Sequence, residues 1–356
     1  MEVNFIDKKF WKGKNIFITG HNGFVGSWLC CALEALNVKK ITGYSLRNNK
    51  KNSLFNNLSF KNNLVKSINA DINNYKKLQE SISLSKPDIV IHLAAQPIVN
   101  IGYEYPINTF ATNILGTANL LNILRSKNYI KSILVITSDK VYKNLEKTTG
   151  YKETDHLGGY DPYSASKAAT EIITESMKLS FFKKDCGIAT SRAGNIIGGG
   201  DWSEDRILPD IVNSLNRKKN IQLRYPNAIR PWQHVLDAIN GYLILLEKLT
   251  KKPKKYSSSW NFGPLEKNVS VKEITEKSIE YWKSEITWQG FSKKKYETKN
   301  LNLNIKKSRS CLNWSPKLKT NQSIKLTIDW YKSFYDNVDI NKLTKKQVNN
   351  YFYDNN

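Results

Sequence analysis

Short apolar runs alternate with longer amphipathic segments along the first half of the chain. The apolar runs are rich in isoleucine, valine and leucine, which is typical of strands buried on both faces of a parallel sheet. The pattern predicts helices that include 27–36, 109–127 and 163–183, and strands at 15–19, 40–46, 64–69, 88–95, 131–137 and 187–192. Strands that alternate with helices in this order predict an α/β fold with a doubly wound parallel sheet.

The alternation loosens after residue 193, where glycines, arginines and tryptophans interrupt the regular pattern. We therefore expect residues 1–193 to form the sheet domain, joined by a return strand near 256–263, and residues 194–335 to form a smaller mixed lobe. The last stretch, 336–356, is polar and is expected to fray. No apolar run reaches the length of a membrane span, and the N-terminal segment lacks a signal-peptide core.

A glycine-rich turn follows the first predicted strand directly and opens the first predicted helix. Its glycines are Gly20, Gly23 and Gly26, with the spacing G-x-x-G-x-x-G. Gly20 permits the tight turn, Gly23 lets a pyrophosphate approach the backbone, and Gly26 lets helix and strand pack closely. The N-terminus of the helix would then face the phosphates. Strand, glycine turn and helix together predict that the domain 1–193 binds a dinucleotide.

Reactive side chains gather at the end of strand 131–137, where Ser138, Asp139 and Lys140 bring a hydroxyl, a carboxyl and an amine. In doubly wound sheets the ligand crevice lies beyond the carboxyl ends of the strands. On the next helix, Tyr163 and Lys167 are one turn apart and can point into the same cavity. A cation beside a phenol favours the phenolate, which makes the tyrosine a usable base. The same spacing is common on ordinary amphipathic helices, and the glycine turn upstream is what favours catalysis here.

The composition is strongly basic, with a formal net charge of +24 over 356 residues. The lysines form short scattered clusters among many asparagines rather than one stripe with interleaved aromatic residues. This distribution favours a solvated surface over a nucleic-acid or membrane interface, although the field would attract an anionic substrate. The four cysteines have neither metal-ligand nor disulfide spacing, so we expect no metal site and a reducing, cytoplasmic location.

The combination of motifs resembles the extended short-chain dehydrogenase/reductase family, and within it the 4,6-dehydratases of nucleotide sugars. The resemblance covers most of the chain up to residue 335. The Asp139-Lys140 pair is its most discriminating feature, because most nucleotide-sugar 4,6-dehydratases have Asp-Glu there. The other motifs are Thr19-Gly20-x-x-Gly23-x-x-Gly26, His92-Leu93-Ala94-Ala95, Asn113-x-x-Gly116-Thr117, Tyr163-x-x-x-Lys167, Arg192-Ala193-Gly194-Asn195 and Arg230-Pro231-Trp232-Gln233-His234.

This resemblance implies a Rossmann-like domain with a tightly held nicotinamide cofactor and a C-terminal lobe that grips a nucleotide sugar. It also implies a homodimer built on the helices near 109–127 and 163–183. NAD is the expected cofactor, but Arg47 follows the second strand where a ribose-binding acid would favour NAD, and an arginine there could accept the additional phosphate of NADP. Val25 stands where this subgroup often has lysine, which should affect only the periphery of the phosphate turn.

The implied reaction removes a hydride from C4 of the sugar, eliminates water across C5 and C6, and returns the hydride to C6. Tyr163 would take the 4-hydroxyl proton while Ser138 holds the 4-oxygen, and Asp139, kept protonated, would protonate the departing 6-hydroxyl. Lys140 would be the C5 base, directly or through water, which requires an uncharged amine. The alternative is that Lys140 only forms an ion pair with Asp139.

The resemblance implies CDP-glucose as substrate and CDP-4-keto-6-deoxyglucose as product. A dTDP-, GDP- or UDP-linked substrate stays open, as do a sugar-nucleotide epimerase or reductase and an idle cofactor-binding protein. His92 is expected to be a packed strand histidine, and Trp202 and Trp232 are expected to pack within the lobe.

The predicted site residues fall into three groups. The catalytic residues are Ser138, Asp139, Lys140, Tyr163 and Lys167. The cofactor would contact Gly20, Asn22, Gly23, Phe24, Val25, Gly26, Asp71, Ile72, Leu93, Ala94, Ala95, Asn113, Tyr163 and Lys167. The nucleotide sugar would contact Gln96, Asn195, Arg206, Arg230 and His234, with the arginines on the diphosphate because a guanidinium matches phosphate oxygens in two contacts.

Overall fold

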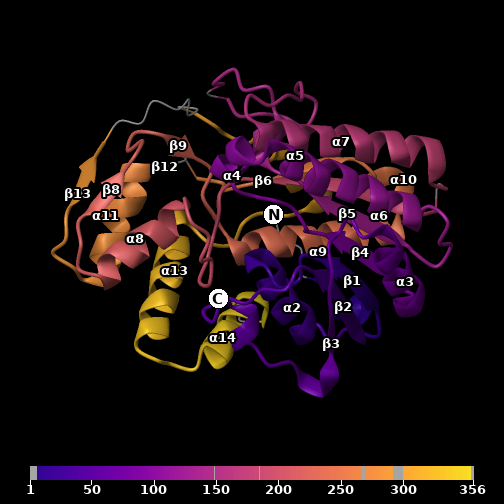
Figure 1. Ribbon diagram of the computed structural model, residues 1–356, viewed down its shortest axis with the longest axis horizontal. Helices are drawn as coiled ribbons and strands as arrows, with labels where there is room; N and C mark the ends of the chain where they lie inside the picture. The colour runs from indigo at the N-terminus through magenta and orange to yellow at the C-terminus, as the bar shows by residue number, and fades with distance from the viewer. Residues whose placement is uncertain (1–5, 148, 184, 267–268, 292–299, 354–356) are drawn as a thin grey trace.

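A parallel sheet forms the centre of the computed structural model, which describes residues 6–147, 149–183, 185–266, 269–291 and 300–353. Within these residues the main sheet has seven strands in the order β11-β6-β5-β4-β1-β2-β3, and every neighbouring pair is parallel (Figure 1). The strands are β1 Asn15–Thr19, β2 Lys40–Ser45, β3 Val65–Asn69, β4 Ile89–His92, β5 Ser132–Ile136, β6 Gly187–Ala193 and β11 Ser259–Phe262. The predicted doubly wound, Rossmann-like sheet is confirmed.

Helices cover both faces of this sheet (Figure 1). Helices α2 (Phe24–Ala35) and α9 (Val235–Lys251) pack on one face, and α3 (Tyr75–Ser85), α6 (Gly116–Leu124) and α7 (Pro162–Phe181) lie over the other. Along β1, Ile16 and Ile18 belong to the core under α2 and α9, whereas Phe17 belongs to the core under α3 and α6. Successive strand residues point to opposite faces, so a strand covered on both sides must be apolar throughout. This explains the continuous apolar runs in the sequence.

The predicted helix 109–127 is composite. Helix α5 (Pro106–Phe110) passes through a π-helical turn, Ala111–Leu115, into α6 without leaving helical geometry. The remaining short elements of the sheet domain are α1 Lys8–Trp11, α4 Val99–Glu104, α10 Pro253–Tyr256 and the 3₁₀ turns Phe55–Asn57, Lys61–Asn63 and Asp139–Val141.

A smaller lobe of helices and short strands stands beside the carboxyl edge of the sheet (Figure 1). In the described part of the lobe the strands pair in three two-stranded sheets, of which β7·β10 and β8·β13 are parallel and β9·β12 is antiparallel. Trp202 packs against the rings of Tyr331 and Phe334, with centroid separations of 5.1 and 4.9 Å, as expected for a packing residue. The elements are β7 Ile196–Ile197, α8 Ile207–Asn216, β8 Ile221–Leu223, β9 Ile229–Arg230, β10 Gln233–His234, β12 Val269–Ser270, α11 Val271–Trp282, β13 Trp288–Gly290, α12 Lys306–Leu312 and α13 Thr320–Tyr335.

The end of the chain corrects the prediction of a fraying tail. Residues Ile340–Tyr353 form helix α14, which packs against α2. Ile340, Thr344, Val348 and Tyr351 are buried at helical spacing, and the Tyr351 hydroxyl donates to Asp237 on α9 at 2.5 Å. With only two aliphatic residues in this stripe, the apolar periodicity was too weak to read from the sequence. Residues 354–356 lie outside the described part of the chain.

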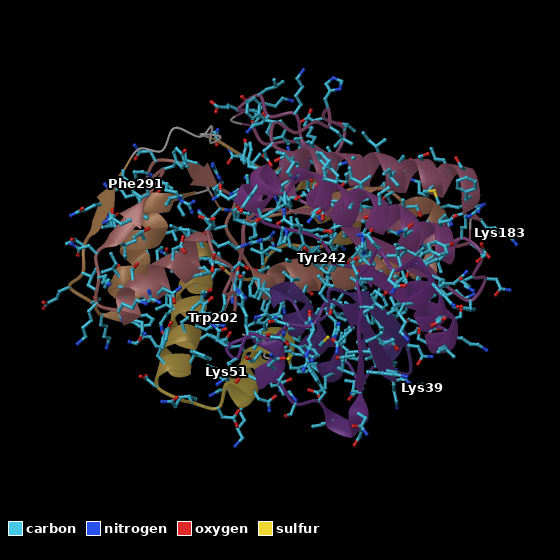
Figure 2. The ribbon with its side chains drawn as sticks, in the orientation of Figure 1. Lys39, Lys51, Lys183, Trp202, Tyr242 and Phe291 are labelled. Atoms are coloured by element: carbon cyan, nitrogen blue, oxygen red, sulfur yellow. The ribbon has the colours of Figure 1, made fainter. Side chains whose placement is uncertain are left out.

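Basic residues are distributed over the outside of the molecule. Lys39, Lys51 and Lys183 are all exposed and project outward at well-separated places, while Tyr242 lies inside (Figure 2). This scatter agrees with a solvated lysine surface. None of the helices in the described ranges is both long and apolar enough to cross a membrane.

Candidate active site

A cavity of about 650 Å³ lies at the carboxyl ends of β1, β4, β5 and β6, between the sheet and the lobe. Loops that leave these strands form one wall, and residues from α8 and the segments around β8 and β9 form the other. Strand order reverses between β1 and β4, and such a switch point is where ligands bind in doubly wound sheets.

The glycine turn forms the floor of this cavity at the start of α2. Gly20 has a φ of +75°, and a side-chain carbon there would lie 2.8 Å from the Ala94 amide nitrogen, so only glycine allows this close approach. A Cβ at Gly26 would overlap the Gly20 carbonyl oxygen, which keeps strand and helix in close contact. Gly23 is the N-cap of α2 and provides no side-chain cap, so the first N–H groups of the helix stay available to an anion. This cradle fits a pyrophosphate.

One end of the cavity lies beyond β2 and β3. Ser45 and Leu46 line it at the end of β2. Asp71 and Ile72, two of the residues expected to contact the cofactor, line it after β3. Arg47 is exposed and does not belong to the lining of the cavity.

The loop after β4 supplies the predicted Leu93, Ala94 and Ala95 to the lining. Two further predicted residues lie behind this loop instead. The Asn113 amide, in the π-helical turn, accepts from the Gln96 backbone N–H at 2.8 Å and donates to its carbonyl at 3.1 Å and to Ser166 of α7 at 2.8 Å. The Gln96 side chain is bonded to the Ile98 N–H at 2.6 Å. Asn113 and Gln96 therefore hold the wall of the cavity rather than face its contents.

His92 is a packed strand histidine, as expected. Its ring lies between the hydroxyls of Thr19, at 2.6 Å, and Thr117, at 2.9 Å, and burial lowers the pKa of His92 to about 3. A neutral, fully bonded ring of this kind cross-links β1, β4 and α6.

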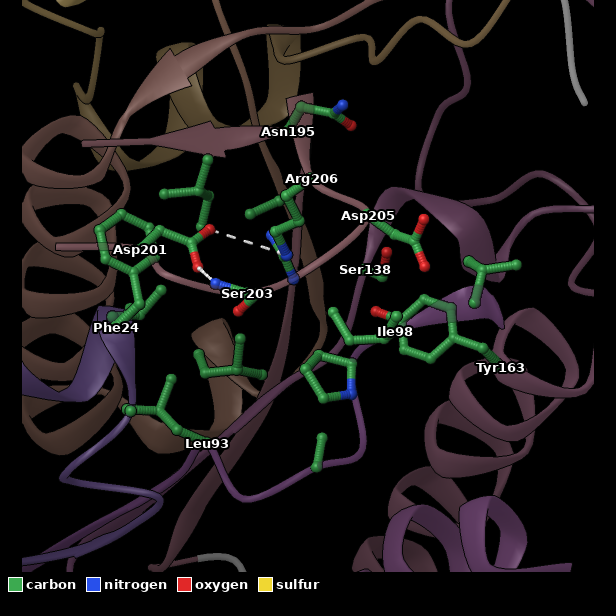
Figure 3. A pocket seen from close by; sticks show the side chains of 18 of the residues that line it. Phe24, Leu93, Ile98, Ser138, Tyr163, Asn195, Asp201, Ser203, Asp205 and Arg206 are labelled. Atoms are coloured by element: carbon green, nitrogen blue, oxygen red, sulfur yellow. Dashed lines mark hydrogen bonds and ion pairs between the residues drawn. The ribbon is translucent and has the colours of Figure 1, made fainter. Parts of the chain in front are cut away.

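Ser138, Asp139, Lys140, Tyr163 and Lys167 all line the same cavity. The first three sit at the end of β5, where the 3₁₀ turn begins, and the last two come from the first turns of α7. The Ser138 hydroxyl donates to Asp139 Oδ1 at 3.0 Å and accepts from the Lys140 N–H at 3.2 Å. Lys167 Nζ donates to the Ile136 carbonyl at 3.1 Å. Figure 3 shows Ser138 and Tyr163 facing each other across the space between strand end and helix.

Burial controls the charge of the Asp139 carboxyl. The residue is 3% exposed, and its Oδ2 atom has no hydrogen-bond partner among the described residues. Burial raises the pKa of Asp139, and the Lys140 charge and the Ser138 hydrogen bond oppose this rise. A carboxyl with a raised pKa and one free oxygen is suited to hold a proton and donate it into the cavity.

Burial of Tyr163 acts against the phenolate that the neighbouring Lys167 is expected to favour. Burial raises the pKa of Tyr163, and the Ser138 hydrogen bond and the Arg206 charge oppose the rise without cancelling it. Burial also lowers the pKa of Lys167 to about 8, against the Glu171 carboxylate, which acts to raise it. The one-turn spacing suggests that the Lys167 charge stabilises a Tyr163 phenolate. Burial of both groups outweighs that stabilisation.

On the lobe side, Asn195, Arg206 and Arg230, three of the expected substrate ligands, line the cavity. Arg206 is partly exposed and pairs loosely with Asp201 at 3.7 Å, the pair joined by a dashed line in Figure 3. Arg230 is buried, and one of its Nη atoms donates to the Ile229 carbonyl at 2.8 Å.

His234 does not face the cavity, which corrects its assignment as a substrate ligand. Its side chain is fully buried and caps helix α9, with Nδ1 accepting from the Leu236 N–H at 3.3 Å. Trp232 of the same motif lines the cavity but is buried and bonded to the Val269 carbonyl at 3.0 Å, which is largely a packing role.

The sequence did not predict a group of charged residues at the lobe wall. Arg224 pairs with Asp205 at 2.7 Å and with Asp210 at 3.7 Å, and all three line the cavity. Burial raises the pKa of Asp210 to about 6, opposed by Arg224. Four acidic residues between positions 201 and 210 were the available signal in the sequence.

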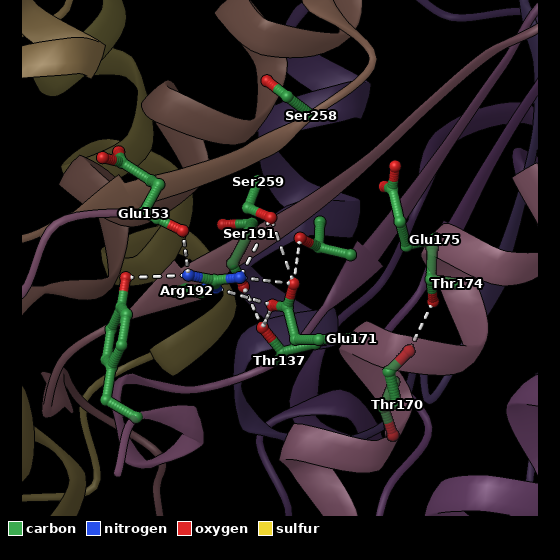
Figure 4. Close-up of polar contacts among 12 residues, drawn as sticks. Thr137, Glu153, Thr170, Glu171, Thr174, Glu175, Ser191, Arg192, Ser258 and Ser259 are labelled. Carbon is green, nitrogen blue, oxygen red and sulfur yellow. Dashed lines mark hydrogen bonds and ion pairs between the residues drawn. The ribbon is translucent and has the colours of Figure 1, made fainter. Parts of the chain in front are cut away.

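A second missed feature is a buried ion pair behind the catalytic helix. Glu171 of α7 and Arg192 of β6 approach to 2.9 Å, and the hydroxyls of Thr137 and Thr190 bond to the same carboxylate (Figure 4). Its signal was the position of Glu171, one helical turn beyond Lys167.

A model of the GDP-mannose 4,6 dehydratase family matches residues 17–327. The chain belongs to this family. A CDP-glucose 4,6-dehydratase from Salmonella typhimurium is 38% identical over 354 residues, which cover 97% of this chain and 98% of that protein. The predicted relationship to the extended short-chain dehydrogenases/reductases, and among them to nucleotide-sugar 4,6-dehydratases, is thereby confirmed.

Solved structures of nucleotide-sugar enzymes and epimerases have the same fold as this chain. A dTDP-glucose 4,6-dehydratase from Streptomyces venezuelae with NAD bound superposes with a TM-score of 0.80 at 17% identity, over 91% of this chain and 98% of that one. An epimerase from Methanothermobacter thermautotrophicus gives a TM-score of 0.83 at 18% identity, over 94% and 96%. At these identities the likeness shows the fold alone.

Proposed function

We propose that this chain is an NAD-dependent 4,6-dehydratase that converts CDP-glucose into CDP-4-keto-6-deoxyglucose and water. The observation that carries the proposal is the placement of Asp139 and Lys140 in one cavity with Ser138, Tyr163 and Lys167. An epimerase or a ketoreductase needs the tyrosine and the lysine of α7 but no acid–base pair to expel a 6-hydroxyl. The 38% identical relative with this activity supports the same conclusion.

In the proposed reaction the side chains move protons. Tyr163 takes the proton of the 4-hydroxyl, and Ser138, already within reach of Tyr163, holds the 4-oxygen. Asp139, kept neutral by burial, protonates the departing 6-hydroxyl, and Lys140 removes the C5 proton that the 4-ketone has made acidic. Lys167 holds its place through the Ile136 carbonyl and completes the electrostatic surroundings of Tyr163.

The dinucleotide would occupy the cavity between the glycine turn and Lys167, within domain 1–193. When bound, its nicotinamide accepts a hydride from the sugar and returns it in the same turnover. The α2 N-terminus would hold the pyrophosphate, and Ser45, Asp71 and Ile72 lie where the adenosine would. We propose NAD rather than NADP, because Arg47 is exposed and does not belong to the lining of this end of the cavity, and because a structural neighbour with the same fold has NAD bound.

The nucleotide sugar would be held by the lobe, 194–335. Arg206 is the candidate that can reach a diphosphate most easily, since it is partly exposed and its present ion pair is long. Arg230 and Asn195 would bond the same group from the neighbouring wall. The similar proteins also include a dTDP-D-glucose 4,6-dehydratase. Recognition of the cytosine base therefore needs an experiment of its own.

We also propose a homodimer in the cytoplasm. Exposed apolar side chains gather on α5, the π-helical turn and α7, three elements packed against one another on one face of the sheet. A second copy of the same surface would cover them in a two-fold arrangement. The four cysteines are all free thiols, which is compatible with a reducing compartment. The apolar side chains in question are Ile107, Leu115, Ile172, Leu179 and Phe181.

The test is to incubate the purified protein in heavy water with NAD and, in parallel, NADP, and to supply CDP-, dTDP-, UDP- and GDP-glucose separately. The mass of the product sugar is the measurement. With CDP-glucose alone we expect a product that has lost one water and has gained one deuterium at C5. The same product from another nucleotide sugar would support the proposed reaction but would change the proposed substrate. No dehydration of any of the four would reject the proposed function and favour an epimerase or a reductase.

A further inference from the structure

One face of helix α7 contacts three consecutive residues at the end of strand β5. Tyr163, Lys167 and Glu171 occupy successive turns of the helix. Tyr163 is within hydrogen-bond reach of Ser138, and Lys167 Nζ donates to the Ile136 carbonyl at 3.1 Å. In the third contact, the Thr137 hydroxyl donates to Glu171 Oε1 at 2.5 Å. The first two contacts involve proposed catalytic residues, and the third involves two residues that the proposed reaction does not use.

Glu171 is held rigidly at its buried position. Both it and its partner Arg192 are 3% exposed. Oε1 accepts from Thr137 and from Arg192 Nε at 3.0 Å, and Oε2 accepts from Thr190 at 2.6 Å and from Arg192 Nη2 at 2.9 Å (Figure 4). Oε2 also accepts from Ser259 Oγ at 3.3 Å. A buried carboxylate with at least two donors on each oxygen, among them a bidentate arginine, cannot shift without leaving a charge or a donor unpaired. The carboxylate therefore links α7 to β6 and to the end of β5 in a fixed arrangement.

We propose that Glu171 is a positioning residue that, through Thr137, holds the end of β5 in register with the reacting face of α7. This inference rests on the proposed dehydratase function. Thr137 lies between Ile136, whose carbonyl receives Lys167, and Ser138, which faces Tyr163. A displacement of Thr137 therefore changes both contacts at once. Asp139 and Lys140 follow directly in the 3₁₀ turn, so their reach to C5 and C6 of the sugar depends on the same anchor.

The chain offers a matched pair of substitutions. Thr137→Val and Thr190→Val each remove one hydroxyl that donates to Glu171, one on each carboxylate oxygen, and both threonines are buried. The ion pair with Arg192 remains in both variants, and the Thr137 backbone keeps its bond to the Ser191 carbonyl at 2.8 Å. Only Thr137 adjoins the catalytic strand end. Thr137→Ser, which keeps the hydroxyl, is the conservative variant.

We expect both valine variants to fold and to lose a similar amount of thermal stability. Thr137→Val should lower kcat for CDP-glucose about 10- to 100-fold, as misplaced catalytic groups do, with KM and NAD content unchanged. Thr190→Val should keep kcat close to that of the wild type, and Thr137→Ser should restore most of it. Hydrogen exchange of the peptide 137–142 should become faster in Thr137→Val and stay unchanged in Thr190→Val.

Equal losses of kcat in the two valine variants, or no loss in Thr137→Val, would overturn the positioning role. Unchanged exchange of peptide 137–142 in Thr137→Val would overturn it as well. If the wild-type protein dehydrates none of the nucleotide sugars, the proposed function fails, while the exchange comparison still decides whether Glu171 anchors the strand end.

Discussion

Asp139 and Lys140 are neighbours in the sequence but meet different surroundings. The carboxyl is buried and its Oδ2 has no hydrogen-bond partner among the described residues, whereas the lysine is half-buried and lines the same cavity. Because desolvation disfavours the charged carboxylate, the same local sequence can provide an acid that keeps its proton beside an amine that reaches solvent and substrate. The different burial of Asp139 and Lys140 thus explains why one is suited to be the acid and the other the base.

Lys140→Met removes the proposed C5 base while keeping a side chain of similar length. We expect the variant to bind NAD and CDP-glucose normally, to oxidise C4, and to lose exchange of the C5 proton with solvent. Deuterium incorporation at C5, measured by mass spectrometry, is the readout. The control is Lys143→Met, an exposed lysine in the same loop that does not line the cavity. Normal C5 exchange in Lys140→Met would remove this lysine from the base role.

Asp139→Asn tests the buried carboxyl through stability. Burial raises the folded-state pKa of Asp139 above its ordinary value of 3.8, so the folded protein binds the proton more tightly than the unfolded chain. The resulting stabilisation is complete below the unfolded pKa and is lost as the pH rises through the folded pKa. The Tm of Asp139→Asn minus that of the wild type should therefore increase as the pH rises through this window and then level off.

The control for this pH series is Asp155→Asn. Hydrogen bonds from Lys147 and the Lys152 backbone lower the pKa of Asp155, so the sign is opposite and the Tm difference should fall with rising pH. The effect should be small, because Asp155 is near the surface and its ion pair is screened by solvent. A pH-independent Tm difference for Asp139→Asn would show that burial does not hold the proton on this carboxyl.

At the scale of elements, helix α14 supports the helix that carries the phosphate cradle. It packs on α2, with Lys345 paired to Glu34 at 2.7 Å and the Tyr353 hydroxyl bonded to the Ala35 carbonyl. It also reaches α9 through Tyr351 and Asp237. The last helix of the chain therefore holds the C-terminal end of α2, whereas the cavity lies at the N-terminal end of this helix.

Ile340→Ala tests this support. Ile340 is buried at the start of α14, and truncating a buried isoleucine to alanine costs about 2–5 kcal/mol. We expect a loss in the lower part of this range, because the site is at the edge of the core, measured as a shift in the urea midpoint at constant m value. Lys346→Ala, an exposed position of the same helix, should change stability by less than about 0.5 kcal/mol. Equal stability of the two variants would mean that α14 is not docked in solution.

At the scale of the whole molecule, the sheet and the lobe enclose the cavity, and one outer face of the sheet's helices carries several exposed apolar side chains. Ile107 is 73% exposed, and Leu115 and Ile172 are more than half exposed on the neighbouring π-helical turn and α7. Apolar side chains that share one surface usually mark an interface, whereas scattered ones do not. The catalytic face of α7 points inward and its apolar face outward, so a dimer formed there would also stiffen the helix that bears Tyr163 and Lys167.

The double variant Leu115→Glu with Ile172→Glu should convert the dimer into monomers, because charges would be buried at the two-fold contact. Analytical ultracentrifugation of the wild type should give the mass of two chains, and of the variant the 40.9 kDa of one. The control is Leu84→Glu, an 83% exposed leucine on α3, which should leave the assembly unchanged. A monomeric wild type would reject the proposed interface.

The features that could be predicted from the sequence are those whose physical cause is local. A strand covered on both faces must be continuously apolar, which is why β1, β4 and β5 were found, and a close turn between strand and helix needs Gly20 and Gly26. Ser138, Asp139 and Lys140 adjoin one another, and Tyr163 and Lys167 are one helical turn apart, so the backbone alone nearly brings each set together. Their shared cavity followed from the strand order that the α/β alternation imposes.

The tertiary structure decided everything that depends on which distant segments meet and how deeply they are buried. His234 and Arg206 looked alike as ligand candidates, yet one caps α9 and the other faces the cavity. Desolvation, which no local pattern measures, keeps the pKa of Tyr163 high and that of Lys167 near 8. The pairing of Glu171 with Arg192 and the docking of α14 on α2 join segments far apart in the chain, and their energies exist only once those surfaces are in contact.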